Sequence, residues 1–295
     1  MNIAILSRGP HLYSTKSLYR AALVRGHKVQ VYDHLHCDIV LEKGKPSIYY
    51  LGEQMPRVDA VIPRIGSSVT FYGSSVVRQF EMMNIFTTLS SEALLRSRDK
   101  LRCMQLISNS QLGIPFTIFA NDTSDSRYLI NSVGGVPLII KLIEGTHGAG
   151  VVLAKDDNTA EAVIEAFSKT KKRFLVQEYI KESKGEDIRA IVVDGEVVAS
   201  MKRKAAPGDF RSNLHRGGSS IHIKLDSKEE ETALKATEIL GLKVAGVDML
   251  QSERGPLLLE VNASPGLEGI EGTTHVDIAG KIVEYIERSM NQASI

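Results

Sequence analysis

Apolar and polar positions alternate with two different periods along the first third of the chain. Short β-branched apolar runs are separated by stretches in which apolar residues lie three and four positions apart, the spacing of amphipathic helices. Strands that alternate with helices usually form a parallel sheet. We therefore expect an α/β arrangement with strands at residues 3–6, 29–32 and 60–62, and helices at about 14–24 and 75–83.

The rest of the chain shows a different pattern. One or two helices are predicted at residues 90–95 and 98–107, and hairpin-like strands follow. Asp194 and Gly195 favour a type I′ turn between strands at 188–193 and 196–201. Hairpins mixed with helices indicate an α+β fold with antiparallel sheets, so the expected domains are 1–95 and 96–295. The remaining strands are predicted at 116–119, 137–142, 174–179, 245–250 and 256–262, and the remaining helices at 159–168, 227–240 and 276–290.

Two of these strands carry oxygen ligands. The polar turn 252–255 joins them, so we expect an antiparallel pair whose side chains point alternately to opposite faces. Glu260 and Asn262 then share a face, and Asp248 can meet them across the pair. Two carboxylates and an amide are ligands of the type that Mg²⁺ prefers, with water or phosphate oxygens in the remaining positions. The pattern predicts a metal–nucleotide site; the alternative is an ordinary hairpin with polar residues facing water.

Lys141 lies inside a predicted strand and is followed by a glycine-rich loop at 145–150. Backbone N–H groups of such a loop can hold phosphates, and the lysine supplies positive charge. Gly145 and Gly150 match the glycines of a P-loop, but valines stand where Lys and Ser or Thr are required, so a P-loop is excluded. The first strand lacks the G-x-G-x-x-G pattern of a dinucleotide-binding site. For Lys141 alone, a lysine reaching solvent from a strand end remains the alternative.

The segment 177–180 ends a predicted strand, where free backbone groups can contact an adenine edge. Glu178 or Asp187 could accept hydrogen bonds from ribose hydroxyls. Taken alone, this segment is more simply explained as a polar turn.

A basic segment punctuated by glycine and proline spans residues 201–218, and we expect it to be a loop. Guanidinium groups there could stabilise the charge that develops on a transferred phosphoryl group. The alternative is a solvated loop, which we prefer for the other basic run, at 169–173. The candidates in the segment are Lys202, Arg203, Lys204, Arg211, His215 and Arg216.

Composition limits the classes of function. The chain has 295 residues, of which 43% are hydrophobic and 24% charged, which is typical of a soluble globular protein. Its net charge of +1 does not favour nucleic acid as the main ligand. We find no signal peptide and no membrane-spanning run, so we expect a cytoplasmic protein without membrane contact.

Together these motifs resemble the RimK family of ATP-grasp carboxylate–amine ligases, and the resemblance covers essentially the whole chain. It is carried by Pro63-Arg-Ile-Gly, Arg98-Asp-Lys-Leu-Arg, the segment 140–154, Val176-Gln-Glu-Tyr-Ile, Asp209-Phe-Arg-Ser-Asn-Leu-His-Arg-Gly-Gly and Glu260-Val-Asn-Ala-Ser-Pro-Gly.

The resemblance implies an ATP-grasp fold and a role for each candidate residue. It implies an acyl-phosphate mechanism that releases ADP and phosphate, with L-glutamate added to the acidic C-terminal tail of a small-subunit ribosomal protein, and poly-α-glutamate as a related product. We also expect a homo-oligomer. By resemblance, Lys100 and Lys141 hold ATP phosphates, Glu178 and Tyr179 contact the adenine, Asp187 contacts the ribose, and Arg211 and Asn213 contact the phosphoryl region. The resemblance also implies that Asp248, Glu260 and Asn262 bind two Mg²⁺ or Mn²⁺ ions. Arg203, Arg211 and His215 would contact the acyl phosphate or the acceptor tail.

Two alternatives remain open at this point. The first is a ligase of the same fold for another substrate, such as a lysine-biosynthesis carrier protein, a glutathione precursor or D-alanine. The second is a regulatory protein that binds a nucleotide without turnover. The intact set of Asp248, Glu260 and Asn262 argues against the second.

Overall fold

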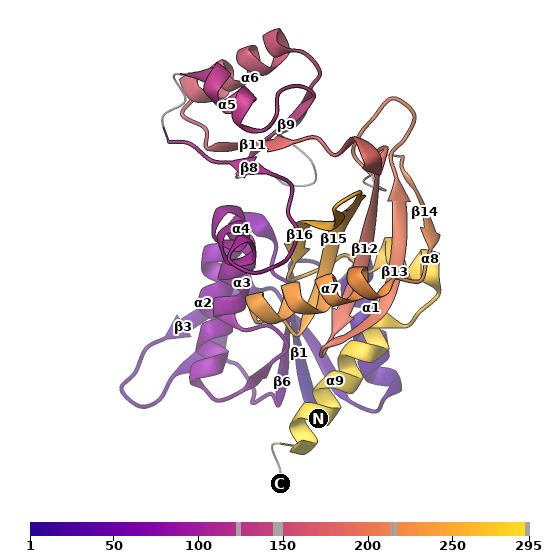
Figure 1. Ribbon diagram of the computed structural model, residues 1–295. Coiled ribbons are helices and arrows are strands. Elements are labelled where there is room, and N and C mark those ends of the chain that lie inside the picture. The colour runs from indigo at the N-terminus through magenta and orange to yellow at the C-terminus, as the bar shows by residue number, and fades with distance from the viewer. Residues whose placement is uncertain (122–124, 144–149, 213, 215–216, 293–295) are drawn as a thin grey trace.

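The computed structural model describes residues 1–121, 125–143, 150–212, 214 and 217–292. Three larger sheets follow one another along the chain (Figure 1). The first is parallel and the other two are antiparallel, as the sequence predicts.

The N-terminal sheet has the strand order β2-β1-β6-β7. Its helices α1 and α2 cover opposite faces, because alternate residues of β1 point to opposite sides: Ile5 packs in the cluster that contains α1, and Leu6 in the cluster that contains α2. The elements are β1 (Asn2–Leu6), α1 (Tyr13–Val24), β2 (Lys28–Tyr32), β6 (Ala60–Pro63), α2 (Thr70–Met82) and β7 (Phe86–Thr87).

Helix α2 begins five residues before the predicted start at 75. Gly73 lies in its first turn, where its role is close packing. A Cβ atom at this position would lie 2.3 Å from Cγ2 of Ile65, so only glycine lets the helix approach the end of β6. The glycine therefore marks a contact and not a helix boundary.

A small antiparallel sheet of strands β3 (Cys37–Val40), β4 (Ser47–Tyr50) and β5 (Glu53–Gln54) was not predicted. These strands are two to four residues long, too short for a clear period. The side chain of Gln79 on α2 donates to the carbonyl oxygens of Val40 and Ser47, both at 3.1 Å, and so attaches this sheet to the helix.

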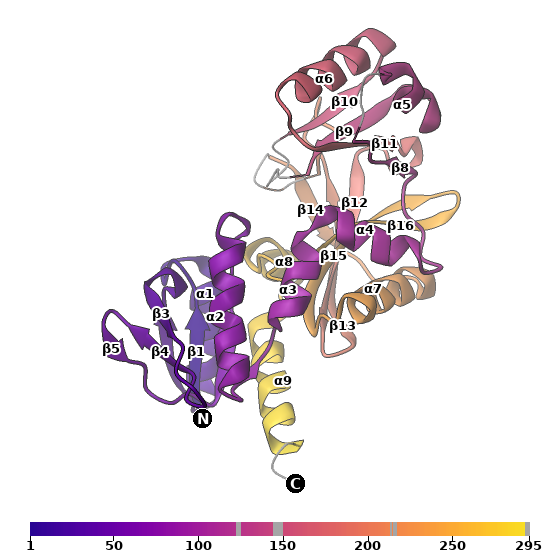
Figure 2. The same cartoon turned by 90° about the vertical axis from the view of Figure 1, so that its left-hand side faces the viewer.

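Two helices lead from the N-terminal sheet to the rest of the molecule. They are α3 (Ser91–Arg98) and α4 (Lys100–Ser108), and each begins after a capping side chain. Ser90 Oγ accepts from the backbone N–H of Ala93 at 3.2 Å, and Asp99 Oδ1 accepts from that of Arg102 at 3.0 Å. Helix α3 packs on α2 on one side, and α4 packs on the long helix α7 (Ser227–Leu240) on the other (Figure 2).

The peripheral sheet has the order β10-β9-β11-β8 and its own small core. Strands β9 and β11 match the prediction, whereas β10, within the valine run that follows the glycine loop, was missed. The peripheral sheet and its helices lie at the far end of the molecule from the N-terminal sheet (Figure 2). Its elements are β8 (Thr117–Ile118), α5 (Ser126–Ser132), β9 (Leu138–Leu142), β10 (Val151–Ala154), α6 (Asp157–Lys169) and β11 (Phe174–Glu178).

The central sheet has the order β14-β13-β12-β15-β16 and lies between these two parts. The predicted turn joins β12 to β13, with positive φ at Asp194 (51°) and Gly195 (80°). One expectation is wrong here: residues 202–204 belong to β13 and not to a loop. The elements are β12 (Glu186–Val193), β13 (Glu196–Lys204), β14 (Ser219–His222), β15 (Val244–Ser252), β16 (Gly255–Asn262) and the C-terminal helices α8 (Glu268–Thr274) and α9 (Ile278–Gln292).

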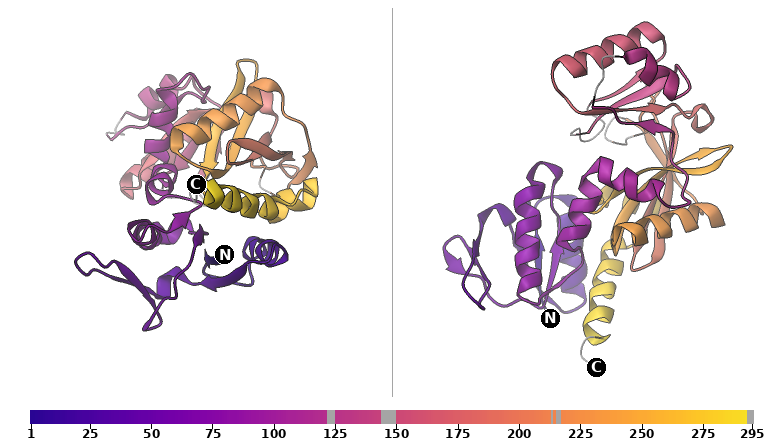
Figure 3. Two further views of the ribbon diagram at one scale, coloured as in Figure 1. Left: turned by 90° about the horizontal axis from the view of Figure 1, so that it is seen from below. Right: turned by 60° about the vertical axis from the view of Figure 1, so that its left-hand side comes forward.

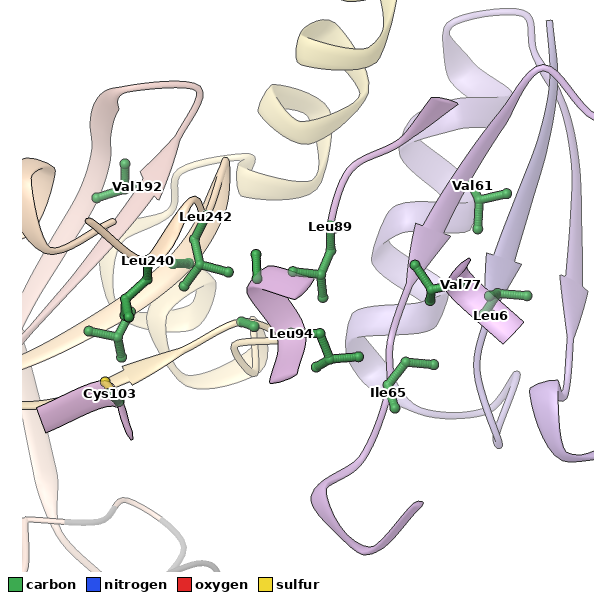
Figure 4. Close-up of a cluster of buried hydrophobic side chains, with 14 of the residues drawn as sticks. Leu6, Val61, Ile65, Val77, Leu89, Leu94, Cys103, Val192, Leu240 and Leu242 are labelled. Atoms are coloured by element: carbon green, nitrogen blue, oxygen red, sulfur yellow. The ribbon is translucent and has the colours of Figure 1, made fainter. Parts of the chain in front are cut away.

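Two apolar clusters hold the N-terminal and central sheets together. One contains side chains of α2, α3, α4 and α7 and one face of the central sheet; in Figure 4, Leu89 and Leu94 lie between Ile65 on the N-terminal side and Leu240 on the other. The second cluster joins α1, α8 and α9 to the opposite face of the central sheet, and α9 runs down between the two parts (Figure 3). This apolar cluster occupies one end of the opposite face of the central sheet, so the polar side chains of that face lie at its other end.

No helix in the described part of the chain is long and apolar enough to cross a bilayer.

Candidate functional site

Four charged side chains form a network on one face of the central sheet, which we call the charged network: Asp187, Arg189, Arg203 and Asp248. Arg203 donates from Nε and Nη2 to the two oxygens of Asp187, at 2.7 and 2.6 Å. Arg189 makes the same bidentate contact with Asp248, at 2.7 and 2.6 Å. Arg203 Nη2 also lies 3.1 Å from Asp248 Oδ2, which joins the two pairs. The register explains the arrangement, because Asp187 faces Arg203 and Arg189 faces Asp248 on neighbouring strands.

The charged network is buried and electrically balanced. Arg203 is 4% exposed and Asp248 5%. Burial alone would raise the pKa of Asp248, but the charges of Arg189 and Arg203 hold it below its usual value, at about 2. Burial would likewise lower the pKa of Arg203, but Asp248 and Asp187 raise it. The Asp248 carboxylate is therefore ionised at neutral pH, and it depends on the two neighbouring cations.

The sequence analysis placed Arg203 in a loop, whereas the structure places it in a strand. A run of Lys, Arg and Lys discourages a strand assignment, yet alternation sends Lys202 and Lys204 outward and Arg203 inward. The acidic partner on β12 compensates the buried charge. Asp187, predicted to contact ribose, is 7% exposed and already accepts two hydrogen bonds from Arg203.

Glu260 and Asn262 follow the predicted geometry of the strand pair. Strands β15 and β16 are antiparallel; Asp248 pairs with Glu260, and Gly246 pairs with Asn262. Alternation places all of these positions on the face of the charged network. Glu260 is exposed, and its carboxylate has no hydrogen-bond partner among the described residues. The set offers oxygen donors that suit Mg²⁺, although a cation would share Asp248 with Arg189 and Arg203.

Lys141 and Lys100 come to this face from two other elements. Lys141 on β9 donates to Gln177 Oε1 at 2.7 Å, and Lys100 at the start of α4 donates to the carbonyl oxygen of Leu142 at 3.3 Å. Burial lowers the pKa of Lys141 to about 8; the negative charge of Glu260 opposes this shift and Lys100 adds to it. Burial also lowers the pKa of Lys100, again against the charge of Glu260. The two lysines and Glu260 are thus close enough to interact electrostatically.

Glu178 and Tyr179 lie at the end of β11, and both are half-buried. The Glu178 carboxylate accepts from the backbone N–H of Phe116 at 2.6 Å and pairs with Arg254 in the turn between β15 and β16. Arg254 thus attaches the central sheet to the peripheral one. The predicted contact of Glu178 with a nucleotide remains a prediction.

Arg211 lies in the segment between β13 and β14. Its guanidinium donates from Nε and Nη2 to the Asp209 carboxylate, at 3.0 and 3.1 Å, and stands 5.3 Å from the centre of the Phe210 ring. Its hydrogen bonds lower the pKa of Asp209. Asn213 and His215, and the glycine loop from 145 to 149, lie outside the described residues, so their predicted roles remain predictions.

Sequence reasoning assigned no role to Arg189, Gln177 or Arg64. Arg189 could have been found from its two-residue spacing to Asp187, which puts both on one face of a strand. Gln177 holds Lys141, and its amide donates in turn to Thr117 Oγ1 at 2.8 Å; only the pairing of β8, β9 and β11 reveals this. Arg64 lies beside the turn that follows Asn262 and donates to the Pro265 carbonyl oxygen at 2.7 Å, although Pro265 is 201 residues away in sequence.

This arrangement suits a polyphosphate with a divalent cation. Two partly desolvated lysines provide positive charge near Glu260, and the oxygen ligands of β15 and β16 lie on the same side. Charged groups fixed in a partly buried site stabilise developing charge better than the same groups in water. The geometry therefore supports phosphoryl chemistry at the polar end of the central sheet.

Comparison with known proteins gives a consistent result. A family model described as "RimK-like ATP-grasp domain" matches residues 97–286, and one described as "RimK PreATP-grasp domain" matches residues 1–94. A protein of Teredinibacter turnerae named "Probable alpha-L-glutamate ligase" is 57% identical over 98% of this chain and 96% of its own length. One of Syntrophotalea carbinolica with the same name is 55% identical over the same shares.

Solved structures show the same fold at lower identity. The ATP-grasp ligase PsnB, in a complex with a minimal precursor, Mg and ADP, has a TM-score of 0.76 at 21% identity, with 98% of each chain covered. This likeness extends through both antiparallel sheets and the N-terminal part.

Proposed function

The chain belongs to the RimK-like ATP-grasp family and is an ATP-dependent carboxylate–amine ligase, and we propose that it adds L-glutamate to the C-terminal glutamate of a small-subunit ribosomal protein. The observation that carries this proposal is the 57% identity, over 98% of the chain, to a protein named as a probable alpha-L-glutamate ligase. The reaction would take place in the cytoplasm, where that target is made, and could extend to poly-α-glutamate.

The proposed reaction has two steps. A carboxylate oxygen of the acceptor attacks the γ-phosphorus of ATP, and ADP leaves, which forms an acyl phosphate. The amine of L-glutamate then attacks the acyl carbon, phosphate leaves, and the amine loses a proton as the amide forms. No side-chain nucleophile is needed. Activation of a carboxylate in this way requires only positioning and charge stabilisation from the protein.

The described residues can provide this stabilisation. Lys141, held by Gln177, and Lys100, held by the end of β9, would bind the phosphates. Asp248, Glu260 and Asn262 would bind two Mg²⁺ or Mn²⁺ ions, which neutralise phosphate charge when bound. Glu260 is the residue best placed for this role, because its carboxylate is exposed.

Glu178 and Tyr179 would contact the adenine at the end of β11. Since Asp187 is fully engaged by Arg203, we propose that it mainly holds that arginine, and a ribose contact would have to share its carboxylate. Arg203, Arg211 and His215 remain our candidates for contacts with the acyl phosphate or the acidic tail, and Asn213 for the phosphoryl region. The separate domains 1–95 and 96–295 and a homo-oligomer are also part of the proposal.

The test is a ligation assay with defined products. The protein is incubated with ATP, Mg²⁺ and L-glutamate, with and without a peptide that ends in glutamate. We expect ADP, phosphate and mass increases of one glutamyl unit. Release of AMP and pyrophosphate would contradict the mechanism. ADP release with another amino acid but not with L-glutamate would indicate a ligase of different specificity, and tight ATP binding without any turnover would indicate a regulatory protein.

A further inference from the structure

Two half-buried arginines lie side by side where the N-terminal sheet meets the central sheet. Arg64 follows the last residue of β6, and Arg98 ends α3. Burial and the charge of Arg98 together lower the pKa of Arg64, to about 10, so the two cations interact unfavourably. Glu260 is the carboxylate whose charge acts on Arg98, which places the pair next to the proposed metal ligands.

The side-chain hydrogen bonds that the two arginines make with described residues go to the backbone. In the described part of the chain, neither one forms an ion pair with a carboxylate. Each gives a hydrogen bond to a backbone carbonyl: Arg64 to Pro265 at 2.7 Å and Arg98 to Ile65 at 2.5 Å. A guanidinium has five N–H donors, so each arginine has donors that are not used by the described residues.

Two buried polar atoms nearby also lack partners among the described residues. They are Nε of Arg98 and Oγ of Ser264, the residue before Pro265. A buried donor without a partner is costly, about 1–3 kcal/mol, and is rare in native proteins unless a ligand completes it. Two such atoms beside two arginines that form no ion pair in the described part of the chain indicate that an anion fits there.

The position in the fold supports the same conclusion. In the strand order β2-β1-β6-β7, β2 is added on one side of β1, whereas β6 and β7 are added on the other side. The order of the strands therefore reverses between β1 and β6, and the helices that follow these two strands lie on opposite faces. Ligands of such sheets bind outside the carboxyl ends of the strands at this reversal. Arg64 stands there, and its backbone N–H donates to the carbonyl oxygen of Leu6 at the end of β1, at 2.8 Å.

We propose that Arg64, Arg98 and Ser264 form a subsite for a carboxylate of the glutamyl substrate, one that stays unreacted during ligation. Guanidinium groups bind carboxylates in bidentate fashion, and the serine hydroxyl can donate a further hydrogen bond. The subsite lies next to Glu260, so a substrate held here has its reacting end near the proposed metal ions. This assignment deepens the proposed function and rests on it for the identity of the substrate.

The first experiment measures binding without ligation. Glutarate carries two carboxylates and no amine, and its binding to the protein in the presence of ADP and Mg²⁺ can be followed by calorimetry. We expect Arg64→Gln and Ser264→Ala each to weaken glutarate binding, the former about tenfold or more, because a charge-assisted bidentate contact is lost. Arg57→Gln, an exposed arginine of the same part of the chain, is the matched control and should not change the affinity. Unchanged affinity in Arg64→Gln, or no glutarate binding by the wild type, would overturn the subsite.

The second experiment separates recognition from a structural role. Turnover is compared for L-glutamate, L-glutamine and the α-amide of L-glutamate, and for acceptor peptides that end in glutamate or glutamine. In the wild type, one of these carboxylate-to-amide changes should raise KM strongly. In Arg64→Gln or Arg64→Lys, the ratio of KM values between that amide and its carboxylate should shrink about tenfold. The substrate for which the ratio shrinks identifies the carboxylate that is bound. An equal loss for every substrate would show that Arg64 only supports the Pro265 turn. If the wild type makes no glutamyl product, the proposed function fails, whereas the glutarate measurement still decides the subsite.

Discussion

Removal of Arg203 should destabilise the protein strongly and in a pH-dependent way. In Arg203→Met, Asp187 loses both hydrogen bonds from its guanidinium partner, at 2.7 and 2.6 Å, and Asp248 keeps only Arg189. The charged network changes from neutral to a net charge of minus one in a site where Arg203 is 4% exposed. Loss of one partner from a buried ion pair costs about 3–5 kcal/mol, since the other charge stays buried without compensation.

The pH dependence follows from Asp248. In the wild type its lowered pKa contributes stability that is present above the unfolded value of about 3.9 and is lost as pH falls through the folded value of about 2. In the variant, burial persists with one cation fewer, so the pKa of Asp248 rises. If it rises above the unfolded value, the folded variant binds the proton more tightly, and its free energy of unfolding increases as pH falls through that pKa. The difference between variant and wild type should therefore shrink from pH 7.5 to pH 4.5.

The assay is urea unfolding followed by far-UV circular dichroism, because the chain contains no tryptophan. Arg57→Met removes an exposed arginine and should change the free energy of unfolding by no more than about 0.5 kcal/mol. The double variant Asp187→Leu, Arg203→Met leaves the neutral pair of Arg189 and Asp248 and should be more stable than Arg203→Met alone. A loss below about 1 kcal/mol in Arg203→Met, or equal losses at both pH values, would refute the role assigned to the charged network.

Three further predictions concern the site itself. Glu260→Ala should abolish ADP release while the unfolding midpoint stays near that of the wild type, because the side chain is exposed; turnover at the wild-type rate would refute the metal assignment. Burial lowers the pKa of Lys141 to about 8, so ADP should bind more weakly at pH 9 than at pH 7 as the lysine loses its proton; Lys141→Arg should remove most of this dependence, and an identical pH profile in calorimetry would argue against a phosphate contact. Gly246→Ala would place a Cβ atom 2.9 Å from Cβ of Pro265 and should cost about 1–3 kcal/mol in thermal or urea unfolding, whereas Gly266→Ala has open space around it and serves as the stability control; similar losses in both would contradict the steric explanation.

Local patterns were sufficient for much of the fold. The helix Ser227–Leu240 was predicted with its observed bounds, because apolar spacing and an acidic start define it: Asp226 and Glu229 form a capping box, in which each side chain accepts from the other's backbone N–H. Strands β15 and β16 were also predicted as an antiparallel pair, and their alternation put Asp248, Glu260 and Asn262 on one face. Such features depend on residues near one another in sequence, so the sequence alone reveals them.

Features that depend on distant partners could not be predicted in this way. Arg203 was assigned to a loop because glycine and proline punctuate the segment 201–218. Only the pairing of β12, β13 and β15 shows the carboxylates that compensate its charge. The close approach of Gly73 to Ile65 likewise depends on how the helix packs against the end of β6.

The sequence by itself determined most of the strands and helices, the family, and the residues of the proposed metal site, since period, turn chemistry and ordered motifs are local properties. The tertiary structure alone decided which charges are buried, which are paired, and which are left without a partner. Arg64 and Arg98 are ordinary basic residues in the sequence. They become a candidate carboxylate site only because the end of the N-terminal sheet packs against the Pro265 turn, where the described chain provides cations and hydrogen-bond donors but no acidic partner.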